Sequence, residues 1–165
     1  MRFRIAAVSC LAAAFAGAVV ADVPVPRFAR TVPVASEPVV ADAATRLQWQ
    51  GCPAGMIGDL YSCSGTAYGM TWQSALDYCQ DSAWAGLTDW YLPSIAELNS
   101  SVDDRAASPA IDSAAFPSTP AAFFWSSTSL PANGSIAWGI NFAIGNAPTD
   151  SKTRTANVRC VRREL

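Results

Sequence analysis

The spacing of apolar side chains predicts one helix that begins at residue 72. These side chains recur at intervals of three, four and seven positions, so one helical face carries Trp72, Ala75, Leu76 and Cys79. Thr71 precedes them, where its hydroxyl can accept a hydrogen bond from a free N–H of the first turn. The pattern therefore predicts an amphipathic helix that packs its apolar face against a core.

A second, shorter helix is predicted directly after Pro93. Ser94 and Glu97 have the spacing of a capping box, in which each side chain bonds the other residue's backbone N–H. The proline disfavours helical conformation at Leu92, so the helix should begin beyond it. Its apolar face would carry Ile95, Leu98 and Val102.

Beyond residue 122 the pattern changes to the two-residue period of β-strands. The segment 123–128 is an apolar run followed by hydroxyl residues, and Asn133-Gly134 has the composition of a tight hairpin turn. After that pair, apolar side chains alternate with small or polar ones, at Ile136, Trp138, Ile140 and Phe142. These features predict an antiparallel strand pair.

Shorter signals complete the predicted strands. Leu47 and Trp49 lie on one side of a short extended segment that ends at residue 50. Gly145-Asn146 predicts a turn, and the segment 154–162 has the alternation of a last strand.

Long segments without either period separate these elements. Residues 51–68 contain four glycines and two cysteines, which predicts an irregular hairpin. Residues 103–122 are rich in proline and predict a long loop, with Ile111 and Phe116 as its anchors in the core. The sum is an α+β domain, with two helices packed on a small antiparallel sheet and long loops between them.

The amino-terminal 41 residues are expected to lie outside that domain. Residues 1–21 have the basic start, the small-residue apolar run and the small final residues of a secretory signal peptide. Cys10 lies too early in this run for a good lipidation signal, and lipidation there is left open. Residues 22–41 contain four prolines and predict an extended tether, which leaves residues 42–165 as the folded domain.

Charge and composition exclude several classes of function. Removing the signal peptide would leave nine basic and thirteen acidic side chains, a net charge of −4. An acidic surface argues against nucleic acid as a partner. The chain has no histidine, which excludes Ser-His-Asp and Cys-His catalysis and the histidine-containing zinc sites.

Four cysteines remain in the exported chain, and an even number favours two disulfides with three possible pairings. The favoured scheme has a local bridge, Cys52–Cys63, and a long one, Cys79–Cys160, that joins the first helix to the last strand. A zinc site made of four thiolates is the alternative, but no C-x-x-C pair is present.

Several segments, taken in order, resemble the Lcl C-terminal domain family, named after the C-terminus of a collagen-like adhesin. They are TRLQWQ, TWQSALDYC, DWYLPSIAEL, FWSSTS, AWGINFAIG and VRCVR, and the resemblance covers about residues 42–163. It implies a C-type-lectin-like fold, in which a cysteine of the first helix pairs with one in the last strand. The E-P-N and W-N-D triplets of calcium-dependent lectins are absent, so calcium-dependent sugar binding is not implied.

Seven side chains are candidate ligand contacts, because loops and strand ends on a rigid scaffold often carry recognition. They are Trp84, Ser126, Ser127, Asn141, Asn146, Arg159 and Arg162. The tryptophan could stack on a sugar or pack in the core. The two arginines belong to a carboxy-terminal basic cluster, which could bind an anion or keep an edge strand solvated.

Acidic residues offer two further alternatives. The loop residues Asp103, Asp104 and Asp112 could ligate calcium, but their spacing matches no EF-hand, and turn-forming roles account for them. Glu97 could act as a general acid, but its capping position already accounts for it. No catalytic residue, metal or cofactor is predicted.

These features predict an exported, non-catalytic binding or adhesion module that recognises an extracellular glycan or protein through its loops. Self-association is left open. One alternative is a structural subunit of a cell-surface or periplasmic assembly. A third, less favoured, is a carboxylate-dependent hydrolase, against which the missing histidine and the missing carboxylate pair argue.

Overall fold

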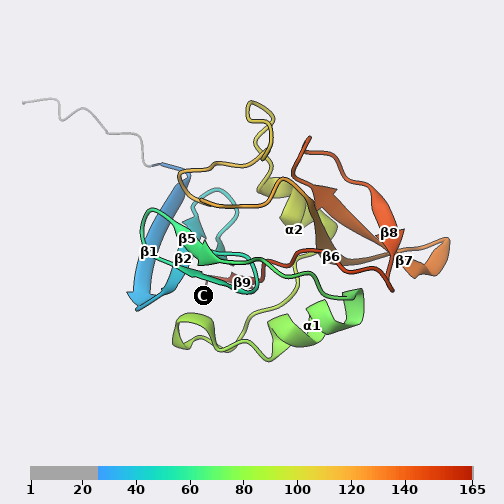
Figure 1. Cartoon of the computed structure of the whole chain (residues 1–165), viewed down its shortest axis with the longest axis horizontal. Coiled ribbons are helices and arrows are strands. Elements are labelled where there is room, and N and C mark those ends of the chain that lie inside the picture. The colour runs from blue at the N-terminus through green and yellow to red at the C-terminus, as the bar shows by residue number, and fades with distance from the viewer. Residues whose placement is uncertain (1–25, 165) are drawn as a thin grey trace, which may run out of the picture.

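The computed structural model describes residues 26–164, and Figure 1 shows the path of the chain. Its helices are α1 (Trp72–Gln80), the single 3₁₀ turn η1 (Trp84–Gly86) and α2 (Ile95–Ser100). Its strands are β1 (Phe28–Val34), β2 (Glu37–Asp42), β3 (Leu47–Gln50), β4 (Met56–Gly58), β5 (Cys63–Gly65), β6 (Phe123–Leu130), β7 (Asn133–Asn141), β8 (Thr149–Ser151) and β9 (Val161–Arg163). The expected signal peptide lies outside the described residues.

The strands form three small antiparallel sheets, ordered β1-β2-β3-β9, β4-β5 and β6-β7-β8. In Figure 1 the blue strands β1 and β2 lie at one end of the molecule and the orange strands β7 and β8 at the other. Helix α2 contacts β6 and β7, and α1 contacts β6. The α+β class is confirmed, with three separate sheets in place of the single one expected. No described helix combines the length and apolar character needed to cross a membrane.

Both helices begin where their capping residues predict. The Thr71 hydroxyl accepts a hydrogen bond from the Ser74 N–H at the start of α1. At α2, Ser94 and Glu97 form both halves of the capping box. These contacts satisfy backbone donors that have no partner within the helix, which is why so short a helix as α2 can form.

Both predicted disulfides are present. Cys52–Cys63 closes the β4–β5 hairpin, and Cys79–Cys160 joins α1 to the segment before β9, 81 residues away in the sequence. By loop entropy, the long bridge stabilises the fold by about 4–5 kcal/mol and the short one by about 3 kcal/mol.

Two clusters of buried side chains form the main core. Trp125 is fully buried in one, together with Trp90 and the Cys79–Cys160 bridge. Trp49 and Phe116 are fully buried in the other, beside Ile111. The predicted anchors of the long loop, Ile111 and Phe116, are therefore confirmed as core residues.

The expected tether of residues 22–41 is wrong for its described part from residue 28 onward. Residues 28–42 form the β1–β2 hairpin, and Val39 and Val40 are buried. Pro33 is compatible with this because β1 is an edge strand and needs no N–H on its outer side. The folded domain therefore extends toward the amino terminus beyond the boundary expected at residue 42.

The β6–β7 turn and the last strand also differ from expectation. Leu130 pairs with Asn133, so the turn consists of residues 131–132 and Asn133-Gly134 belongs to β7. Pro131 takes the turn position that proline favours. The expected strand 154–162 is regular only at β9, because the preceding residues form single bridges to several elements.

The buried indole of Trp125 provides a test of the core. Its Nε1–H donates a hydrogen bond of 2.9 Å to the Met70 carbonyl. Trp125→Ala should lower the free energy of unfolding by about 3–5 kcal/mol, since it leaves a large cavity and an unpaired acceptor. Urea denaturation with intact disulfides measures this loss. Trp138→Ala, on a half-buried residue, is the control; equal losses from the two variants would contradict this description of the core.

Candidate functional site

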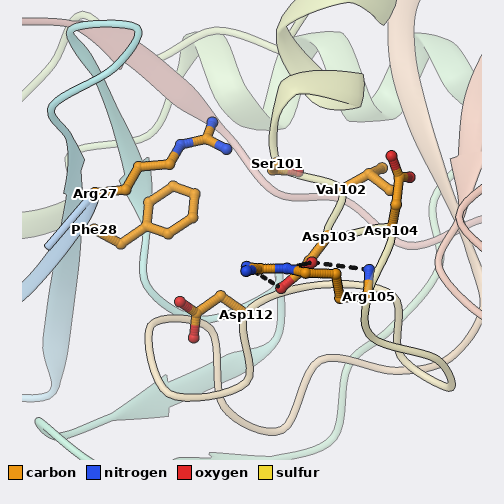
Figure 2. Close-up of a pocket in the computed structure, with 8 residues that line it drawn as sticks. All are labelled: Arg27, Phe28, Ser101, Val102, Asp103, Asp104, Arg105 and Asp112. Carbon is orange, nitrogen blue, oxygen red and sulfur yellow. Dashed lines mark hydrogen bonds and ion pairs between the residues drawn. The ribbon is translucent and has the colours of Figure 1, made fainter.

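The loop that follows α2 forms one wall of a charged cleft, and the start of β1 forms another. The cleft encloses about 360 Å³, and Figure 2 shows the side chains that line it. Three of them are aspartates, Asp103, Asp104 and Asp112; Arg27 and Arg105 are basic, and Phe28 is aromatic. A cleft of this size can hold a small ligand or one end of a larger one.

The Arg27 wall of the cleft is fixed by a paired charge. Arg27 donates from Nε and Nη2 to the Asp42 carboxylate, at 3.0 and 2.8 Å, and from Nη2 to the Ser100 carbonyl. Its guanidinium also lies 4.5 Å from the centre of the Phe28 ring. Burial raises the pKa of Asp42, but hydrogen bonds from Arg27, Thr45 and the Ala44 N–H outweigh it and hold that pKa below its ordinary value.

The loop wall is held in place by backbone hydrogen bonds at both ends. Val102 and Ile111 form a bridge that closes the loop at its base. The Ala110 N–H donates to the Phe142 carbonyl at 2.7 Å, and the Ser108 N–H donates to the Ala143 carbonyl at 3.2 Å. The long loop and the turn 141–146, two of the segments expected to carry recognition, are therefore side by side.

Within the loop, the aspartates differ in how much bonding capacity they retain. Asp103 accepts hydrogen bonds from the Arg105 side chain and N–H, which lower its pKa. Asp112 Oδ1 accepts from the N–H groups of Ala114 and Ala115, the turn role that the sequence allowed. Asp104 is exposed and forms no hydrogen bond or ion pair with the described residues, so its carboxylate is available to a ligand.

The cleft offers polar and charged contacts to a ligand. No group of three or more acidic or cysteine side chains in residues 26–164 is arranged to hold a metal ion. Outside the cleft, the Glu97 carboxylate is already engaged by Ser94 and by the Tyr91 hydroxyl. The cleft presents the available Asp104 carboxylate, the ion-paired side chains Arg105 and Arg27, and the aromatic edge of Phe28.

Several of the seven candidate contacts have structural roles. The Trp84 indole donates to the Pro38 carbonyl at 2.8 Å, so it packs against the β1–β2 hairpin. Ser126 is buried and its hydroxyl donates to the Trp138 carbonyl. The Asn141 side chain accepts from the Ala143 N–H and shapes the turn. Asn146 is exposed beside the loop cleft, whereas Ser127 lines a different cleft beside α1.

The expected surface patch of Arg159 and Arg162 is wrong. Arg159 is only 2% exposed and donates to the carbonyls of Gln50 and Gly51 and to the Thr119 hydroxyl. Burial, and secondarily the charge of Arg30, lower its pKa to about 9, which leaves it protonated at neutral pH. Arg162 is also buried, paired with Asp89 and bonded to Gln48. Both side chains face inward because residues 156–162 run through the interior.

Arg27, Phe28 and Arg105 are lining residues that the sequence reasoning missed. The first two were placed in a tether, where no contact was expected. Arg105 follows two aspartates, and this D-D-R run is the one local signal that could have indicated an ion pair in the loop.

The Arg27–Asp42 pair predicts how stability depends on pH. The pKa of Asp42 is lower in the folded chain than its unfolded value of about 3.9. The stability that the ionised Asp42 gives the fold is therefore fully present above its unfolded pKa. It is lost as the pH falls through the folded pKa of Asp42. Denaturation at pH 7 and pH 3 should show a smaller acid-induced loss for Asp42→Asn than for the unmodified chain. The same loss in both would contradict the assignment.

Arg159→Ala should destabilise the domain rather than simply weaken a surface contact. It removes a buried side chain and leaves the Gln50 carbonyl and the Thr119 hydroxyl without their donor, for a loss of roughly 3–5 kcal/mol in unfolding free energy. Arg154→Ala is the matched control, because Arg154 is 70% exposed in a surface pair with Asp150 and should cost no more than about 1 kcal/mol. Thermal denaturation followed by circular dichroism compares the two, and equal melting temperatures would contradict the prediction.

Comparison with known proteins agrees with the resemblance noted in the sequence motifs. The sequence model of the Lcl C-terminal domain matches residues 38–162, which includes both disulfides, both helices and the loop wall of the cleft but not Arg27 and Phe28. No similar protein was found among the curated proteins compared with the chain. The match begins within β2, ahead of the domain boundary expected at residue 42. Since it covers most of the sequence, the chain belongs to the Lcl C-terminal domain family.

Proposed function

We propose that this chain is an exported, non-catalytic binding module that holds an extracellular ligand, such as a glycan, against the loop cleft and the turn 141–146. The observation that carries the proposal is how the loop is built. Its base is bridged at Val102 and Ile111 and its backbone is bonded to Phe142 and Ala143, yet Asp104 has no hydrogen-bond or ion-pair partner among residues 26–164. A fixed loop with available polar groups loses little conformational entropy when it binds.

The available groups favour a ligand rich in hydroxyls. Asp104 can accept hydrogen bonds, and the 91% exposed Arg105 retains donors beyond those it gives to Asp103. Ile144, 69% exposed in the adjacent turn, adds an apolar contact for a ring face. Opposite charges close together do not suit a strongly anionic or cationic partner, but they do suit a polyhydroxylated one.

Export and the absence of turnover are further parts of the proposal. The basic, apolar start of the chain and its two disulfides support export, since such bonds persist in oxidising compartments. The lack of histidine and the engagement of Glu97 by its capping partners support binding without catalysis.

The alternative of a structural subunit is favoured by one surface. Ile57, Leu60 and Tyr61 of the β4–β5 hairpin are exposed, Tyr61 by 84%. Such apolar side chains are what a contact with another chain would cover. Sedimentation of the purified exported protein distinguishes a structural subunit from a binding module. A structural subunit requires a stable oligomer or a partner that co-purifies with it.

A glycan array probed with the exported protein tests the binding function. The double variant Asp104→Asn, Arg105→Ala should weaken binding about tenfold or more, since hydrogen bonds to charged groups are lost. Asp150→Asn, on β8 and outside the residues that line the loop cleft, should leave binding unchanged. EDTA should have no effect; a loss of binding in EDTA would instead indicate a cation held by the loop aspartates.

The proposal fails if no glycan binds, or if binding is as strong in the double variant as in the unmodified chain. Circular dichroism of the variant confirms that the fold is retained, which makes a loss of binding interpretable.

A further inference from the structure

A second cleft lies between α1 and the extended segment that precedes α2. It encloses about 410 Å³. One wall is the exposed face of α1, where Gln73, Asp77 and Gln80 follow one another at helical spacing. The other wall is the segment 90–92, and Ser127 closes one end.

The two walls of this cleft are attached to two consecutive residues near the end of the chain, Cys160 and Val161. Helix α1 is bonded covalently through Cys79 to Cys160. The opposite wall is paired with Val161, because Tyr91 and Val161 exchange two backbone hydrogen bonds of 2.8 and 2.9 Å. The width of the cleft is therefore fixed by the fold, and a ligand would find it already formed.

The polar groups in the cleft retain unused bonding capacity. The Gln80 amide and the Ser127 hydroxyl form no hydrogen bond with other described side chains or backbone groups. Asp77 uses Oδ1 to accept from the Gln73 side chain at 2.9 Å, which orients both groups and leaves Oδ2 available. Planar amide and carboxylate groups held in this way can bind pairs of vicinal hydroxyls.

The remaining lining is apolar, and the cleft has little charge. The half-buried Leu76 and Tyr91 give the floor its accessible apolar surface, because the other apolar lining residues, Trp90 and Leu92, are only 3% and 2% exposed. Asp77 is the one charged group of the cleft. An apolar floor beneath neutral hydrogen-bonding groups matches the two faces of a sugar ring. A peptide could not bind here by adding a strand at Tyr91, because the Tyr91 backbone groups are already used by Val161.

We propose that the α1 cleft is a binding site for neutral saccharides, separate from the loop cleft. Gln80, Asp77 and Ser127 bond the hydroxyls, and the accessible apolar surface of Leu76 and Tyr91 packs against the apolar face of the ring. The loop cleft is lined by five charged side chains, three aspartates and two arginines, whereas the α1 cleft is lined by one.

The test uses the full exported protein and defined neutral probes: maltohexaose, cellohexaose, mannohexaose and chitohexaose. Isothermal titration should detect binding of at least one probe, and tryptophan fluorescence should change because Trp90 lies at the floor. Asp77→Asn and Gln80→Ala should each weaken that binding, the first about tenfold. Asp81→Asn, just beyond α1 and outside the cleft, is the matched control and should bind as the unmodified chain does.

Three results would overturn the proposal. One is the absence of binding to all four probes. Another is binding that Asp77→Asn and Gln80→Ala leave unchanged while the loop variant Asp104→Asn, Arg105→Ala abolishes it, which would leave the loop cleft as the glycan site. The third is a Gln80-dependent interaction with unfolded casein peptides in place of saccharides. Because Gln73, Asp77 and Gln80 are exposed, their variants should fold normally, and the melting temperature checks this.

Discussion

The fold depends on the path of one segment, residues 156–163, through the middle of the molecule. Ala156 pairs with Met70 before α1, and Asn157 pairs with β6. Further along, Cys160 is bonded to α1, and Val161 pairs with β3 on one side and Tyr91 on the other. Figure 1 shows this dark red stretch between the blue and orange halves.

This central segment explains why its charges do not reach the surface. Arg159 lies between the two halves, where its donors satisfy carbonyl groups of Gln50 and Gly51 that no strand partner reaches. Its guanidinium also lies 4.8 Å from the centre of the Phe116 ring. Arg30 donates to the Gly51 carbonyl too, and to that of Ala115. Both arginines thus replace backbone pairing where the long loop meets the core, a role that a charged side chain can fill only when its donors are well satisfied.

The two clefts follow from the same organisation. Core packing and bonds to the central segment fix the positions of the helices, so the surfaces between them are rigid. The loop cleft depends on contacts of the long loop with Phe142 and Ala143, and the α1 cleft on Cys160 and Val161. Each cleft brings together segments far apart in the sequence, as expected where stability and recognition are assigned to different parts of a fold.

The sequence by itself determined the features that rest on local chemistry. The caps at Thr71 and Ser94, the pairing of four cysteines and the loop anchors Ile111 and Phe116 were predictable, because each depends on near neighbours or on a small number of alternatives. Tertiary structure decided the rest. The β1–β2 hairpin could not be predicted from the sequence because its prolines argue against strands. A proline is accepted in a strand only when that strand lies at the edge of a sheet, or when the proline lies near the start of the strand. The burial of Arg159 and the assembly of both clefts depend on long-range pairing, which no local pattern of apolar and polar residues records.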